Sequence, residues 1–195
     1  MAKNKKMLVM LAAFLLVGGS LFAQAGDKTY SIGDVGPAGG IIFFDQGSFQ
    51  NGWRYLEAAP ASAEFEAKWS GKKIDVPGLG TSVGSGKRNT QLIVEEMNKK
   101  KEKQSAALQC SNLEINGFKD WYLPSIDELV QLYVNRERIG GFQNSRYWSS
   151  SQHNKGSAKT VVFGLEYAFV TYLMPGTPSD NNKPDTRRVR PIRAF

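Results

Sequence analysis

The chain has 195 residues, with 25 lysines and arginines against 18 acidic residues and a formal net charge of +7 at pH 7. Its single cysteine excludes a fold held together by internal disulfides. The length suits one domain with a substantial core rather than several domains.

The first 25 residues have the pattern of a cleavable export signal. A positive start is followed by an apolar run of 11 residues, Met7 to Val17, and then by Ala23-Gln24-Ala25, an A-x-A cleavage pattern. The run is shorter than the roughly 20 apolar residues of a membrane-spanning helix, and no cysteine stands at the cleavage site to carry a lipid. We therefore expect a signal peptide at residues 1–25 and one exported domain at residues 26–195. This domain would be periplasmic, secreted or bound to the cell surface, without a membrane span.

Removal of the signal lowers the net charge. Residues 1–25 contain three lysines and no acidic residue, so 22 basic and 18 acidic residues remain, a net charge of +4. A charge of this size fits a soluble domain with a modest attraction to polyanions, and it does not indicate a nucleic-acid partner.

The first half of the exported chain predicts a hairpin followed by a loop. The apolar run Ile41 to Phe44 is typical of a strand covered on both faces, and Trp53 to Ala59 reads as its hairpin partner. Ala61 to Trp69 could form a short helix. The glycine-rich stretch Gly71 to Gly86 favours an exposed loop.

Two helices are expected next. Asn89 or Thr90 can cap the first of them, and its end carries a run of lysines between Lys99 and Lys103, typical of a solvated face. The second is expected over Ala106 to Leu113. Within it, Cys110 has apolar neighbours and is interpreted as a buried small residue rather than a nucleophile.

The stretch Asn116 to Leu132 (NGFKDWYLPSIDELVQL) carries the clearest local signals in the chain. A glycine turn leads into a short aromatic strand at Trp121 to Leu123, and a helix follows. Ser125 and Glu128 form a capping-box pattern at the start of this helix. The helix should end near Gly140-Gly141.

The remaining chain predicts β-structure interrupted by a polar loop. Tyr147 to Ser151 reads as a strand, and Val161 to Leu173 as a hairpin that turns near Gly164 to Glu166. A polar loop is expected over Pro175 to Thr186. In the closing segment, Val189 to Phe195, a proline indicates a bulge or an edge position.

Five phrases in this order resemble a family of exported bacterial domains: GDVGPAGGIIFFD, GWRYLEAAP, NGFKDWYLPSIDEL, YWSSS and VRPIRAF. The family occurs as the C-terminal domain of collagen-like surface adhesins and as stand-alone secreted proteins of unknown function. The match covers Tyr30 to Phe195. In the adhesins the resemblance implies binding to sulfated polysaccharide, although the collagen-like region is missing here.

Within the third phrase, NGFKDWYLPSIDEL, a tryptophan is followed by Leu-Pro, by a serine and by an acidic residue with Glu-Leu. This pattern is distantly similar to that of formylglycine-generating (sulfatase-modifying) enzymes, which have a C-type-lectin-like fold. This resemblance implies an α+β domain with its first and last strands paired and two main helices. Trp121, Trp148 and Phe195 would then lie in the core. The paired cysteines and Glu-Pro-Asn motifs of calcium-dependent lectins are absent, as are the cysteines of formylglycine chemistry, so neither activity is carried over.

The expected function is that of an adhesin-like binding module for acidic or sulfated glycans, the alternative being an interaction protein that binds another protein of the envelope. Candidate ligand contacts are the basic residues of the glycine-rich loop and of the chain end, since arginine forks suit sulfate and carboxylate groups. They are Lys87, Arg88, Arg187, Arg188 and Arg190, with Arg193 and the lysines at 99–103 as further candidates.

Catalysis has little support in the sequence, and we expect no enzyme activity, no cofactor and no metal. His153 is the only histidine and lies in a polar loop. The serines at 149–151 lack the G-x-S-x-G elbow. Capping explains Asp127 and Glu128, and we expect the helix N-terminus to keep both carboxylates ionised. The loop Asp180 to Asp185 does not match the spacing of an EF-hand calcium loop.

Overall fold

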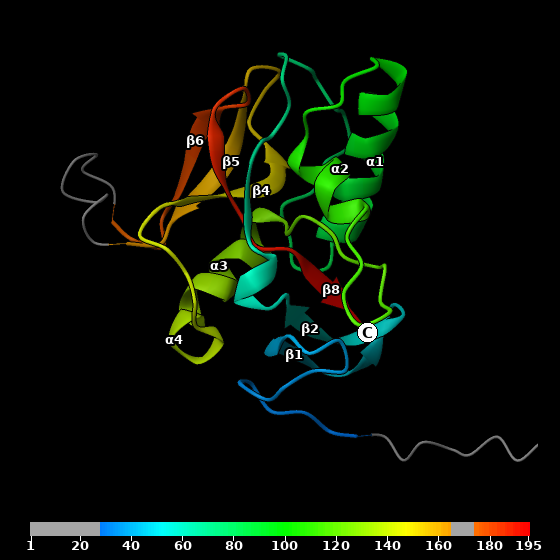
Figure 1. Ribbon diagram of the computed structural model, residues 1–195, viewed down its shortest axis with the longest axis vertical. Helices are drawn as coiled ribbons and strands as arrows, with labels where there is room; N and C mark the ends of the chain where they lie inside the picture. Colours follow the sequence, from blue (N-terminus) through cyan, green and yellow to red (C-terminus); the bar gives the residue numbers. More distant parts are fainter. Residues whose placement is uncertain (1–27, 165–173) are drawn as a thin grey trace, which may run out of the picture.

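The computed structural model describes residues 28–164 and 174–195, which form a mixed α+β structure (Figure 1). The expected signal peptide lies outside this part of the chain, as does the expected second arm of the hairpin beyond Gly164. Among the described helices, none is long and apolar enough to cross a membrane.

The described strands form two sheets. The smaller one has the order β1–β2–β8 and is antiparallel, with β1 at Ile41–Gln50, β2 at Trp53–Ala58 and β8 at Ile192–Ala194. The larger one has the order β3–β7–β4–β5–β6. Its strands are β3 Phe65–Lys68, β4 Arg146–Gln152, β5 Ser157–Val162, β6 Pro178–Asn182 and β7 Thr186–Val189.

The hairpin of β1 and β2 is confirmed, but the expected pairing of the first and last strands is wrong. β8 pairs with β2, through Leu56 opposite Ala194 and Ala58 opposite Ile192. The outer edge of β1 is already occupied, because Gly33 donates to the carbonyl of Ile42 and the amide of Ile42 donates to the carbonyl of Asp34. Strand β8, at the end of the chain, therefore pairs with the free edge of β2 and completes the sheet.

The helices of the described ranges lie beside these sheets: α1 Gly86–Lys99, α2 Ala106–Ser111, α3 Ile126–Val134 and α4 Arg136–Ile139. Both α1 and α3 pack against β4. The capping box of α3 is confirmed, since Ser125 Oγ accepts from the amide of Glu128 and the Glu128 carboxylate accepts from the amide of Ser125. The short α4 follows α3 directly and is capped by Gly140, where the helical segment was expected to end.

The expected start of the first helix at Asn89 or Thr90 is wrong, because α1 begins at Gly86. Both side chains are buried and bond to other segments. Asn89 bonds to both backbone groups of Gly80, and Thr90 bonds to both backbone groups of Leu123. Asn89 and Thr90 therefore form hydrogen bonds with distant segments and do not cap the helix.

Three further expectations of local structure are corrected by pairing between distant segments. Only a 3₁₀ turn at Ala61–Ala63 replaces the expected helix, because the following residues pair with β7 as strand β3. The expected loop after Pro175 contains strand β6, which pairs with β5. The aromatic strand at Trp121 to Leu123 is reduced to a single bridge between Tyr122 and Ile192.

The core confirms most of the expected buried residues. Trp121 and Trp148 are buried, while Phe195 is half-buried and stacks against Tyr30 and Tyr55. Cys110 is buried, and this burial raises the pKa of its thiol, which keeps it protonated and unreactive.

Candidate functional site

The fold does not bring together the expected basic contacts of the glycine-rich loop and those of the chain end. The arginines of the chain end are tied to carboxylates. Arg190 is buried and bonds to Glu64 at 2.8 Å, and Arg188 approaches the other oxygen of Glu64 at 3.1 Å. Arg187 pairs with Asp185 at 2.9 Å. These contacts give the three arginines structural roles.

Arg193 is occupied in the same way. Its guanidinium bonds to Asp120 at 2.9 Å and to the buried Glu57 at 3.1 Å. Glu57 also accepts from the amides of Ala38 and Gly40. This network therefore joins β8 to the N-terminal turns.

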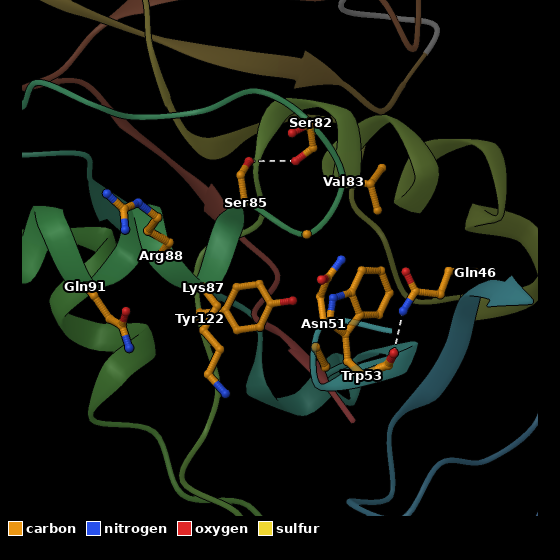
Figure 2. A pocket seen from close by; sticks show the side chains of 12 residues that line it. Gln46, Asn51, Trp53, Ser82, Val83, Ser85, Lys87, Arg88, Gln91 and Tyr122 are labelled. Atoms are coloured by element: carbon orange, nitrogen blue, oxygen red, sulfur yellow. Dashed lines mark hydrogen bonds between the residues drawn. The ribbon is translucent and has the colours of Figure 1, made fainter. Parts of the chain in front are cut away.

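Lys87 and Arg88 are different, because both are exposed and neither forms an ion pair within residues 28–164 and 174–195. They leave the first turn of α1 and line a cavity of about 560 Å³ (Figure 2). Figure 2 shows the guanidinium of Arg88 pointing away from the ring of Trp53, so Arg88 lies at the rim.

The cavity lies where the end of the β1–β2 hairpin faces the start of α1. The hairpin contributes Gln46, Asn51 and Trp53 to its wall. Gln46 anchors this wall, because its side-chain amide donates to the carbonyls of Trp53 and Gln50. The rest of the lining consists of Gln91, Ser82, Ser85, Val83, Gly84, Tyr122 and Ala194.

Trp53 provides an aromatic surface on the hairpin side. It is half-buried, with its ring centroid 6.2 Å from that of Phe44. Gly84 also comes close to the indole, since a Cβ atom on this glycine would lie 3.2 Å from Cζ2. The loop before α1 thus packs against the ring and leaves part of it open to the cavity.

Two buried side chains hold this loop in place. Asn89 bonds to the amide and carbonyl of Gly80, each at 2.8 Å, and Glu128 accepts from the amide of Gly84 at 2.8 Å. The same carboxylate accepts from the amide of Ser125 at 2.7 Å. The cavity wall is therefore fixed to the body of α1 and to the start of α3 without a ligand.

Glu128 does not behave as the capping pattern alone suggests. Its side chain is fully buried, and this burial raises its pKa to about 7, although hydrogen bonds from Ser125, Gly84 and Gly86 act in the opposite direction. The expectation that the helix N-terminus keeps this carboxylate ionised is thus wrong below about pH 7. Desolvation outweighs the stabilisation by the N–H groups.

Tyr122 lies at the floor of the cavity, and Figure 2 shows its hydroxyl pointing toward Trp53 and Asn51. A smaller cavity of about 190 Å³ shares Lys87, Gln91 and Tyr122 with the first. Its lining also includes Lys119 and the acidic Asp120.

The residues considered for catalysis have structural partners. The hydroxyls of Ser149, Ser150 and Ser151 donate to the carbonyls of Lys159, Pro124 and Gly80, respectively. They connect β4 to β5, to the start of α3 and to the cavity loop, which accounts for the row of three serines.

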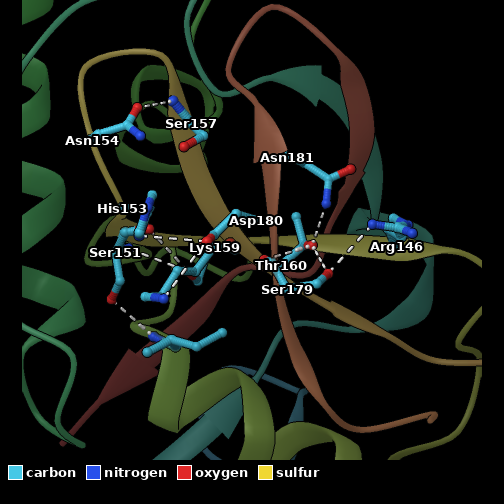
Figure 3. A network of polar contacts seen from close by, with 12 residues as sticks. Arg146, Ser151, His153, Asn154, Ser157, Lys159, Thr160, Ser179, Asp180 and Asn181 are labelled. Carbon is cyan, nitrogen blue, oxygen red and sulfur yellow. Dashed lines mark hydrogen bonds and ion pairs between the residues drawn. The ribbon is translucent and has the colours of Figure 1, made fainter. Parts of the chain in front are cut away.

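His153 lies in the network of Figure 3, with its Nδ1 3.4 Å from Asp180, which also pairs with Lys159 at 3.4 Å. In the same figure Thr160 bonds to Ser179 and Asn181 and joins β5 to β6. The described residues contain no group of three potential metal ligands of the His, Cys, Asp and Glu types. The carboxylates of the loop considered for calcium, Asp180 and Asp185, face basic side chains instead.

Trp53 and Tyr122 were expected to be strand residues rather than lining residues of a site. For Trp53, the sequence did contain a signal of an exposed position: the residue directly follows a polar turn, where a side chain can face outward. Tyr122 carried no such signal, because its position at the cavity depends on the separation between the hairpin and α1.

The chain matches no protein-family model and no curated protein. Among solved structures it is similar to a fimbrial protein from Bacteroides ovatus ATCC 8483, with 16% identity and a TM-score of 0.49 over 73% of this chain. The chain spans 36% of that protein's length. A similarity of this size carries no argument about fold or function.

Proposed function

We propose that this protein is an exported, non-catalytic binding module that holds an acidic or sulfated glycan in the cavity between Trp53 and Lys87. The observation that carries the proposal is the composition of this cavity. One preformed space is lined by a half-buried aromatic ring, by side-chain amides and by cations that have no ion-pair partner among the described residues.

Each component fits a part of a charged sugar chain. The indole of Trp53 offers a flat apolar surface to one face of a sugar ring. Gln46, Asn51 and Gln91 carry amides that can both donate to and accept from hydroxyl groups. Lys87 and Arg88 attract sulfate or carboxylate groups, to which their hydrogen bonds are charge-assisted.

The contrast with the arginines of the chain end supports the choice of this site. The arginines at 187, 188, 190 and 193 already pair with internal carboxylates, whereas Lys87 and Arg88 do not. The second cavity, which shares Lys87, Gln91 and Tyr122 with the first, favours several linked sugar units over a single terminal one.

The export signal pattern of residues 1–25 supports a location outside the cytoplasm, in the periplasm, in the medium or on the cell surface, as for an adhesin. The motif resemblance supports a C-type-lectin-like fold. The α+β composition is consistent with that assignment.

The test is binding of the protein to an immobilised panel of sulfated, carboxylated and neutral glycans at low and physiological salt. We expect retention on the charged members that falls steeply as salt rises, because binding to a polyanion releases counterions. The variant Lys87→Ala/Arg88→Ala should lose most of this retention. A control with the same charge change, Lys72→Ala/Lys155→Ala, alters exposed lysines of another cavity and should retain binding.

Failure of the wild-type protein to bind any member at low salt would refute the proposal. Equal losses in both double variants would also refute the site, since they would indicate a diffuse effect of net charge.

A protein partner in the envelope is the second candidate, and one observation favours it. Phe49 is 70% exposed beside a cavity of about 830 Å³ that is lined by Tyr30, Tyr55 and Phe195. Contact through such an apolar surface should depend little on salt. Salt-insensitive binding to an envelope protein that Phe49→Ser abolishes would favour this function over the first.

A further inference from the structure

One buried hydroxyl of the cavity lacks a hydrogen-bond partner. In the described residues, three buried side-chain polar atoms have none: Ser105 Oγ, Trp121 Nε1 and Tyr122 Oη. Of these residues, only Tyr122 lines the cavity that contains Trp53 and Lys87. A buried hydroxyl without a partner lowers stability, so its presence beside a cavity requires an explanation.

The fold restricts the position of the Tyr122 ring. The backbone of Tyr122 is fixed in both directions to Ile192, with N–O distances of 2.8 Å and 3.0 Å. The residue is only 2% exposed and packs with the apolar residues beneath the small sheet. Gly86 comes so close that a Cβ atom there would lie 2.9 Å from Cε2 of the ring.

We propose that Tyr122 is a specificity-determining residue whose hydroxyl donates a hydrogen bond to an oxygen of the bound glycan at the floor of the cavity. This inference rests on the proposed function of the cavity. In Figure 2 the hydroxyl points into the space between the start of α1 and Trp53, where a sugar stacked on the indole would lie.

The chemistry of the hydroxyl determines which ligand group it binds. Burial, together with the carboxylates of Glu128 and Asp120, raises the pKa of Tyr122 well above its ordinary value, so the phenol stays protonated and can donate. An acceptor oxygen of a carboxylate, sulfate or hydroxyl group satisfies this donor. An ammonium group can only donate to the phenol oxygen, which leaves the phenol proton without an acceptor, and it meets Lys87 as a like charge. The cavity should therefore bind sugars with a free amino group more weakly than sugars with an acceptor oxygen at this position.

The test compares two buried tyrosines that differ in their internal partners. Tyr122→Phe should weaken binding of the glycan that the wild-type protein retains by about tenfold, the effect of one good hydrogen bond. Its thermal unfolding midpoint should stay equal or rise, because the free protein loses no bond. Tyr147→Phe is the matched control. The hydroxyl of Tyr147 donates to Glu64 at 2.8 Å and accepts from the amide of Gln143 at 2.7 Å. This control should lower the midpoint and leave binding unchanged.

The outcomes separate this inference from the proposed function. If Tyr122→Phe binds as the wild type does while Lys87→Ala/Arg88→Ala loses binding, the role of the hydroxyl is refuted and the site stands. A lower unfolding midpoint for Tyr122→Phe would also refute it, since the hydroxyl would then have an internal role. If the wild-type protein binds no glycan, the proposed function and this inference fall together.

Discussion

The buried carboxylate of Glu128 makes the stability of this protein depend on pH in a way that one substitution should remove. Glu128 accepts hydrogen bonds from Gly84 and Ser125 at 2.8 Å and 2.7 Å, and burial raises its pKa from 4.5 to about 7. Glu128→Gln keeps the size of the side chain but cannot ionise. We expect the variant to lose the part of the pH dependence that arises at this position.

The sign and size follow from proton linkage. Because the folded state binds the proton of Glu128 more tightly than the unfolded state does, the free energy of unfolding falls as pH rises from 4.5 to about 7. Each pH unit in this window changes it by about 1.4 kcal/mol, which gives a loss of about 3 kcal/mol in the wild type. Above pH 7, Glu128 causes no further loss in the free energy of unfolding.

The assay is urea unfolding of both proteins between pH 4 and pH 8. In Glu128→Gln the new amide group replaces one acceptor oxygen that faces backbone N–H groups, so the variant should be less stable than the wild type in acid. As pH rises through the window, the wild type should lose about 3 kcal/mol relative to the variant. Groups that titrate alike in both proteins cancel in this difference.

Asp127→Asn controls for the loss of an acidic residue from the first turn of α3, because Asp127 is exposed in the same turn. Its stability should follow the pH dependence of the wild type. Parallel pH curves for the wild type and Glu128→Gln would refute the reasoning. They would mean that water reaches the carboxylate and that burial does not control its ionisation.

Three further substitutions test two buried contacts of the fold and one more exposed ion pair. Arg190→Ala should lower the free energy of unfolding by about 3–5 kcal/mol, because it leaves the carboxylate of Glu64 buried without its closest cation. Arg187→Ala, which removes a more exposed ion pair, should cost less than about 1 kcal/mol in the same urea titration. Gly86→Ala would place a methyl group 2.2 Å from Glu128 Oε2 and should cost about 1–3 kcal/mol. Wild-type stability in Arg190→Ala or Gly86→Ala would contradict the close packing described here.

The local elements of this protein could largely be predicted from its sequence. The capping box of Ser125 and Glu128, the hairpin of β1 and β2 and the burial of Cys110 each depend on residues near one another in the chain. Such features follow from side-chain chemistry and short-range geometry, which the sequence states directly. The mixed α+β composition follows from the same local patterns.

Contacts between distant segments decided the rest. Strands β3 and β6 have little apolar alternation and exist because β7 and β5 offer them hydrogen-bonding partners. The expected arginine site was lost for a similar reason, because Glu64 is 126 residues from Arg190 in sequence and 2.8 Å from it in space.

The candidate site also depends on tertiary structure. Lys87 was expected to contact a ligand from its charge alone, but its neighbours Trp53 and Tyr122 come from other parts of the chain. The sequence determined that a basic residue stands at the start of α1. Only the fold decided which basic residues meet an internal carboxylate and which face a cavity, since pairing of charges depends on distances that no local pattern contains.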